Sequence, residues 1–158
     1  MASWSEFASA APTLAATVRA ALHQYGAGLG YLATIRADGG PRIHPVSPAV
    51  VAGGLYCCLL DTPKRRDLER DGRYALHAFP AEESDDEVSV RGVARLVTDP
   101  ELVRRIATQL RAEPQLDWWL YELDIDTAIF VRRGDESQQI WADPTRARPR
   151  PCPSASAL

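Results

Sequence analysis

Hydrophobic residues recur at helical spacing in the first part of the chain. Leu14, Val18 and Leu22 fall on one stripe of a helix. Upstream of them, Ser3 and Glu6 have the spacing of a capping box. This pattern predicts that the N-terminal segment is helical and that its apolar stripe faces a core.

Further along the chain the hydrophobic period shortens, and short extended segments alternate with turns. Two helices are expected among them, one beginning near Thr62 and Pro63 and the other capped by Asp99 and Pro100. Closely spaced hairpins favour an antiparallel barrel, since every parallel pair requires a long crossover. Two prolines mark the second extended segment as an edge or irregular strand. The segments predicted to be strands are 31–35, 42–48, 55–60, 74–79, 88–97 and 127–132.

The composition is that of one globular domain, with 158 residues, 46% hydrophobic and 25% charged. A net charge of -3 argues against a nucleic-acid partner, which would need a basic surface.

The chain has no run of about 20 apolar residues and no secretory signal, so we expect no membrane span and a cytoplasmic location. Repeated Pro, Arg, Ser and Ala predict a tail over 143–158, after a domain over 1–142.

The cysteines do not predict a metal site. Cys57, Cys58 and Cys152 make an odd count, and their spacing fits neither a zinc site nor a redox pair. Successive strand residues point to opposite faces, so at most one of Cys57 and Cys58 would face a ligand. We therefore expect reduced thiols.

The run Thr62-Pro63-Lys64-Arg65-Arg66 has an unusual charge pattern. It places three cations at the start of a predicted helix, which already carries about half a positive charge. A bound phosphate would offset these charges, because it accepts the free backbone N–H groups and charge-assisted hydrogen bonds from Lys64 and Arg65. By itself, the run fits a basic surface helix with solvated side chains equally well.

Arg42 precedes Thr62 by 20 residues, with a predicted strand between them. With this spacing the stretch from about Tyr31 to Asp99, and more loosely on to Trp141, resembles the pyridoxamine 5'-phosphate oxidase-like family of FMN-binding split barrels. The resemblance implies a mainly β (α+β) fold: an antiparallel split β-barrel with flanking helices. It also implies FMN as the cofactor, with the deazaflavin coenzyme F-420 as the alternative.

In the resembling family, an Arg on the second strand, a Ser or Thr in the following turn and a Lys or Arg pair hold the cofactor phosphate. The matching residues here are Arg42, Thr62, Lys64 and Arg65, and the resemblance implies that the next residues of the second strand would lie beside the flavin ring. The cofactor-binding residues that the resemblance implies are Arg42, His44, Pro45, Val46, Cys57, Cys58, Thr62, Lys64, Arg65 and Trp141.

The resemblance further implies a homodimer in which each cofactor lies between two barrels, partly covered by the other subunit. Glu87, Trp118, Trp119 and Trp141 are candidates for that cover. For the neighbouring Trp118 and Trp119, a dimer-interface role is favoured over cofactor contact.

The chain departs from true pyridoxamine phosphate oxidases at two places. They carry a Lys on the second strand where Ser47 stands here, and an Arg-X-His motif near the C-terminus. The present tail has Arg146, Arg148 and Arg150 without a His. Pyridoxamine phosphate is therefore not the expected substrate, and the sequence looks closer to the short flavin and deazaflavin branch.

The function favoured is a flavin- or deazaflavin-dependent oxidoreductase acting on a small organic substrate. His44 is a weak candidate for a proton donor, since its reference pKa of about 6.5 allows both protonation states near neutrality. The alternatives are a non-catalytic flavin carrier, because a cofactor site alone does not establish turnover, and a haem-binding split barrel using His44 or Cys57.

Overall fold

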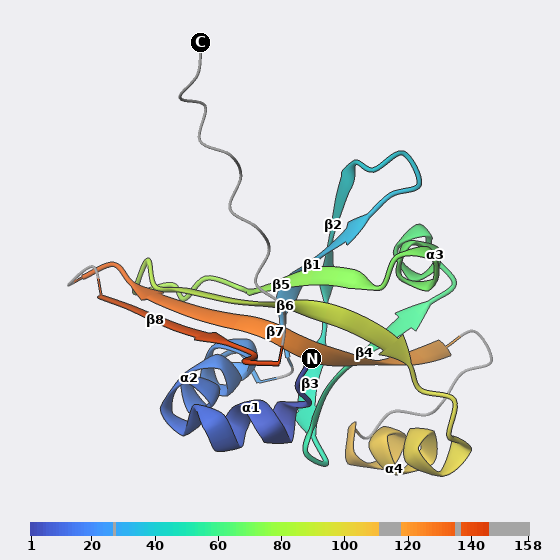
Figure 1. Ribbon diagram of the computed structural model, residues 1–158, viewed down its shortest axis with the longest axis horizontal. Helices are drawn as coiled ribbons and strands as arrows, with labels where there is room; N and C mark the ends of the chain where they lie inside the picture. Colours follow the sequence, from blue (N-terminus) through green and yellow to red (C-terminus); the bar gives the residue numbers. More distant parts are fainter. Residues whose placement is uncertain (27, 111–117, 135–136, 146–158) are drawn as a thin grey trace.

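The computed structural model describes residues 1–26, 28–110, 118–134 and 137–145 of the chain. Over these ranges the chain forms helices and one antiparallel sheet of eight strands (Figure 1). The helices are α1 (Trp4–Ala10), α2 (Pro12–His23), α3 (Pro63–Arg70) and α4 (Pro100–Leu110). The strands are β1 (Gly30–Ile35), β2 (Pro41–Val46), β3 (Pro48–Val51), β4 (Gly54–Leu60), β5 (Arg73–Ala78), β6 (Glu87–Leu96), β7 (Trp118–Arg132) and β8 (Ser137–Ala142).

The two edge strands of the sheet are neighbours in the sequence. The strand order is β2-β1-β5-β6-β7-β4-β3, and β8 pairs with β7 outside this path. Only Ser47 separates the end of β2 from the start of β3, so one residue joins both ends of the path. The sheet must curl to satisfy this connection, and the fold is the predicted mainly β split barrel. The position of β2 at the edge also confirms the prediction made from its prolines.

Helices α1 and α2 cover one face of the sheet, beside β7 and β3 (Figure 1). The predicted helical stripe on α2 is buried, with Val18 and Leu22 exposing 0% and 1% of their surface. These side chains join the main core with Phe7 of α1 and with Leu32 and Leu76 of the sheet. Burial of such side chains stabilises the fold by about 1.5–3 kcal/mol each.

The capping box at the N-terminus is confirmed. The Glu6 N–H donates to the Ser3 hydroxyl at 3.3 Å, and the Ser3 N–H donates to the Glu6 carboxylate at 2.7 Å. Pro12 starts a second helix after Ala11, whose φ of -140° is not helical, so the N-terminal segment contains two helices.

The six predicted strand segments all form, although two boundaries were wrong. The segment 42–48 divides at Ser47 into β2 and β3, and the last predicted strand, 127–132, begins nine residues earlier at Trp118. β8 was not predicted, because five of its six residues are exposed and it shows no hydrophobic alternation.

The domain boundary at residue 142 stays a prediction. Asp143, the first residue of the expected tail, is buried and accepts the N–H of Thr145 at 2.8 Å. Residues 146–158 lie outside the described ranges. Among the helices that the structure describes, none combines the length and the apolar character needed to cross a membrane.

Gly92 allows β6 and β7 to approach closely at a shift in their register, between Arg91 and Gly92. A Cβ atom on Gly92 would lie 1.9 Å from the carbonyl oxygen of Asp124. We therefore expect Gly92→Ala to lower the free energy of unfolding by about 1–3 kcal/mol, measured by urea denaturation. Gly134→Ala is the control, because nothing lies within 4 Å of its Cβ position. Equal stability of the two variants would contradict the close approach.

Candidate functional site

One face of the edge strand β2 carries the first half of the candidate site. Arg42, His44 and Val46 are the less exposed residues of the strand, because side chains alternate between its two faces. Ile43 and Pro45 lie on the opposite face, and Ile43 exposes 64% of its surface. Of the residues expected beside a flavin ring, Pro45 therefore points away from His44 and Val46.

The start of α3 carries the second half. Thr62 is the N-cap residue and Pro63 the first helical residue, as predicted. The Thr62 hydroxyl does not cap the helix; instead it donates to the carbonyl of Leu60 at 3.2 Å. The N–H groups of Arg65 and Arg66 donate to the Thr62 carbonyl, so the first turn is closed by the backbone alone.

A buried carboxylate joins the two halves. Asp67 of α3 is 4% exposed and lies against the sheet. Its Oδ2 accepts a hydrogen bond from Arg42 Nε at 2.7 Å and another from Thr34 Oγ1 of β1 at 3.0 Å. Arg70 adds an ion pair to Oδ1 at 3.4 Å. Burial raises the pKa of Asp67, but the hydrogen bonds from Arg42 and Thr34 outweigh it and hold that pKa below the ordinary value.

Most cations of α3 are paired with carboxylates. Arg65 binds Asp61 at 3.0 Å, forms an ion pair with Glu69 and lies over the ring of Trp119, 4.3 Å from its centroid. Arg66 also reaches Asp61, at 3.4 Å. These contacts turn the guanidinium of Arg65 towards Trp119 of β7. The resemblance, by contrast, implies that Arg65 holds the cofactor phosphate.

Lys64 is different from its neighbours. Its ammonium group forms no hydrogen bond or ion pair with any residue in the described ranges. Its charge lowers the pKa of His44 on β2 and that of the Cys57 thiol on β4, so Lys64 acts on groups of both strands. The chain's only lysine is thus an unbalanced positive charge at the start of α3.

His44 is a neutral imidazole with an unused nitrogen. Its Nε2 atom is buried and has no hydrogen-bond partner in the described part of the chain. Burial, followed by the charges of Lys64 and Arg42, lowers the pKa of His44 below its ordinary value. A buried polar atom without a partner is costly, so Nε2 is suited to a ligand group.

The two cysteines of β4 face opposite sides, as predicted. Cys57 is 1% exposed within the main core, whereas Cys58 packs with Tyr56 and Ile106 beneath α4. Burial raises the pKa of each thiol to about 12. Both are therefore protonated thiols at neutral pH.

Of the expected covering residues, Trp141 and Glu87 have partners elsewhere in the chain. Trp141 of β8 packs on Phe7, with ring centroids 4.9 Å apart. Glu87 forms an ion pair with Arg133. Trp119 lies beside α3 through its contact with Arg65.

Sequence reasoning missed Asp67 and Thr34. The available signal was Asp67 in an arginine-rich helix, downstream of a predicted strand that carries Arg42. A carboxylate there would have been expected to turn inward, towards the cation.

The antiparallel sheet joined at Ser47, with a cationic helix start against its edge strand, defines a split-barrel protein. Residues 14–144 match the family described as pyridoxamine 5'-phosphate oxidase. The chain belongs to this family. No curated protein sequence matches it.

Solved structures share this fold at low sequence identity. A haem-binding protein from Mycobacterium smegmatis has a TM-score of 0.63 and 23% identity; the match covers 79% of this chain and 57% of that protein. The general stress protein 26 from Bacillus anthracis has a TM-score of 0.58 and 18% identity, with coverage of 79% and 97%. A putative pyridoxamine 5'-phosphate oxidase from Listeria innocua has a TM-score of 0.59 and 16% identity, with coverage of 79% and 95%.

The effect of Lys64 on His44 is directly measurable. We expect the pKa of His44, followed by NMR titration of the imidazole, to lie below its ordinary value. Lys64→Met should raise it, because the substitution removes a nearby positive charge. Arg66→Met is the control, since Arg66 pairs with Asp61 and does not act on His44. An unchanged His44 pKa in Lys64→Met would show that the two groups do not interact.

The carboxylate of Asp67 should stabilise the fold in a pH-dependent way. Asp67→Asn is expected to lower the free energy of unfolding at pH 7 by about 2 kcal/mol, measured in urea. Because the pKa of Asp67 is lowered, its contribution is present at neutral pH and is lost as the pH falls through that lowered value. The difference from the wild type should therefore shrink in acid. Glu69→Gln, at a side chain 46% exposed, should change stability little, and an equal loss there would contradict the special role of Asp67.

Proposed function

We propose that the chain binds a phosphorylated flavin-type cofactor at the start of α3 and serves as an oxidoreductase for a small organic substrate. The single observation that carries the proposal is the unpaired Lys64, beside Arg42 and the neutral, unpartnered His44. FMN is the first candidate for the cofactor.

The charges and donors of this cluster suit a phosphate. Arg42 uses only Nε in binding Asp67, and its terminal nitrogens form no hydrogen bonds with the described residues. Lys64 adds a second cation, which has no carboxylate partner among the described residues. Asp67 fixes the Arg42 side chain, so little side-chain entropy would be lost on binding. Arg42 and Lys64 would hold the phosphate, with Arg65 in support from its place over Trp119.

His44 would serve the ring end of the cofactor. As a neutral imidazole it offers either a donor or an acceptor at Nε2, depending on its tautomer. Val46, on the same face of β2, provides apolar contact beside it. The bound flavin would supply hydride transfer, while the protein anchors the phosphate and orients the ring.

FMN is placed ahead of coenzyme F-420 because of how the arginines are paired. The long anionic tail of F-420 would need a continuous basic track. The arginines of α3 and the start of β5 could form such a track, but each has a carboxylate partner within the chain: Arg65 with Asp61 and Glu69, Arg66 with Asp61, Arg70 with Asp67, and Arg73 with Asp71. The unbalanced charge is confined to the helix start, which suits a compact phosphate.

The site lies along β2, an edge strand that pairs only with β1, so we propose that a second copy of the chain completes it. Ile43 exposes 64% and Tyr31 38% of their surfaces on the outer face of β2 and β1. Trp141 remains a candidate to cover the ring from the partner, since within its own chain it lies against Phe7.

Haem binding is the second candidate function. His44 favours it, because a neutral imidazole with a free Nε2 is a common axial ligand. A haem-binding protein also shares the fold. Cys57 is a poor ligand here, because burial raises the pKa of its thiol to about 12.

The test is a binding titration of the purified chain with FMN, followed by flavin fluorescence. Lys64→Ala and Arg42→Ala are each expected to weaken FMN binding about tenfold or more, through loss of a charge-assisted hydrogen bond. Arg66→Ala is the matched control, because Arg66 is exposed and paired with Asp61. Circular dichroism checks that Arg42→Ala, which leaves Asp67 with only Thr34 and Arg70 as partners, still folds.

The outcomes separate the candidate functions. Unchanged affinity for both FMN and F-420 in Lys64→Ala and Arg42→Ala would overturn the phosphate site. A Soret band that is lost in His44→Ala would favour haem over flavin. Flavin binding without turnover by any added reductant would favour a carrier.

A further inference from the structure

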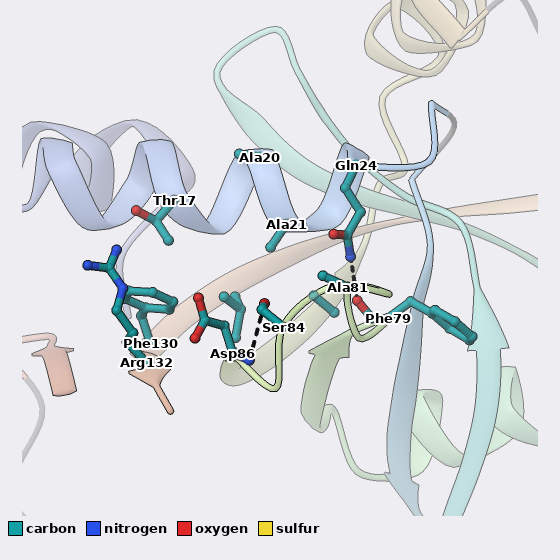
Figure 2. A pocket seen from close by; sticks show the side chains of 12 residues that line it. Thr17, Ala20, Ala21, Gln24, Phe79, Ala81, Ser84, Asp86, Phe130 and Arg132 are labelled. Atoms are coloured by element: carbon teal, nitrogen blue, oxygen red, sulfur yellow. Dashed lines mark hydrogen bonds between the residues drawn. The ribbon is translucent and has the colours of Figure 1, made fainter. Parts of the chain in front are cut away.

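A pocket of about 360 Å³ lies away from the Arg42 and Lys64 cluster, between α2 and the end of the half-barrel (Figure 2). Helix α2 forms one wall, and the segment 79–86 forms another. The ends of β6 and β7 close the remaining side, through Val88 and Phe130. Its volume falls within the range of about 300–1,000 Å³ that is usual for small-molecule sites.

Small side chains create this hollow. Ala20 and Ala21 line it from α2, Ala78 from the end of β5, and Ala81 from the adjoining segment. Val88, Phe79 and Phe130 add larger apolar walls, and Val88 belongs to the main core. An apolar ligand group could therefore enter without displacing a large side chain.

Hydrogen bonds within the chain hold the walls of the pocket together. Gln24 Nε2, near the end of α2, donates to the Phe79 carbonyl at 2.6 Å, as Figure 2 shows. The Tyr25 hydroxyl donates to the Pro80 carbonyl at 2.8 Å. These contacts hold the segment 79–86 against α2, so the pocket is largely preformed.

One cation and one carboxylate share the same end of the pocket. The guanidinium of Arg132 lies over Phe130, 5.5 Å from the ring centroid, and forms no ion pair in the described ranges. Asp86 is held in place because its Oδ1 accepts the Arg133 N–H at 3.1 Å, which leaves Oδ2 available. Arg132 and Asp86 do not pair with each other; Figure 2 shows both near Thr17, beneath α2.

We propose that this pocket binds a free α-amino acid with a branched aliphatic or aromatic side chain. The ligand carboxylate would pair with Arg132 and its ammonium group with Asp86, while the side chain lies against Ala21, Ala78 and Val88. A simple anion would be repelled by Asp86, and a purely apolar molecule would bury both charges unpaired. Only a zwitterion satisfies both charges and the apolar walls.

The test is isothermal titration of the full chain with L-leucine and two analogues that each lack one charge. 4-Methylpentanoate retains the carboxylate, and 3-methylbutylamine retains the amine. Each analogue is expected to bind about tenfold or more weakly than L-leucine. No measurable binding of L-leucine, L-isoleucine or L-phenylalanine would overturn the proposal, as would equal binding of L-leucine and 4-methylpentanoate.

Variants locate the binding. Arg132→Gln and Asp86→Asn should each weaken L-leucine binding about tenfold, and Asp86→Asn keeps an oxygen acceptor for the Arg133 N–H. Arg133→Gln and Asp85→Asn are matched controls, because these neighbours lie outside the pocket lining. Ala20→Leu fills the pocket from an exposed helical position and should abolish binding without unfolding the chain. Retained binding in Ala20→Leu, or losses in the controls equal to those at Arg132 and Asp86, would overturn the assignment.

This proposal is independent of the flavin site. Lys64→Ala should leave L-leucine binding unchanged, and Arg132→Gln should leave FMN binding unchanged, because the two sets of residues are separate. Failure of one proposal can therefore be distinguished from failure of the other.

Discussion

Ser47 alone connects the two edge strands of the sheet, so the sheet has to bend until its ends meet. This connection brings β2 towards the end of β4, and α3 follows β4 directly. Asp67 then fastens α3 to the edge, through Thr34 of β1 and Arg42 of β2. The closure of the sheet is thus the reason why residues some 20 positions apart form a single cluster.

The charges at the start of α3 show how the chain balances stability against binding. Asp61, Asp67 and Glu69 neutralise the arginines of the helix, which reduces their repulsion from the helix dipole. Lys64 is left out of this arrangement, and the His44 imidazole beside it is kept neutral. The unfavourable charge is therefore concentrated at one point rather than spread over the helix.

Much of the fold was predictable because strand and helix periods depend on local sequence. Proline positions correctly indicated the edge strand, and the capping box formed as expected. The N-terminal half of β7 and all of β8 were not predicted. The burial of their side chains depends on which strands pair with them, and the local sequence does not show this. The same limit applied to the site: Arg42 and Lys64 were found from spacing, but the partnership of Arg42 with Asp67 exists only in three dimensions.

The solitary lysine has a consequence for chemistry at this site. In most proteins, reagents that acylate amines are distributed over many surface lysines, and cellular acetylation is equally diffuse. In this chain every side-chain amine reaction is directed to Lys64, at the start of α3 and next to His44. A single covalent change, whether introduced by an experimenter or by a metabolic acyl donor, would remove the charge on which the cluster depends.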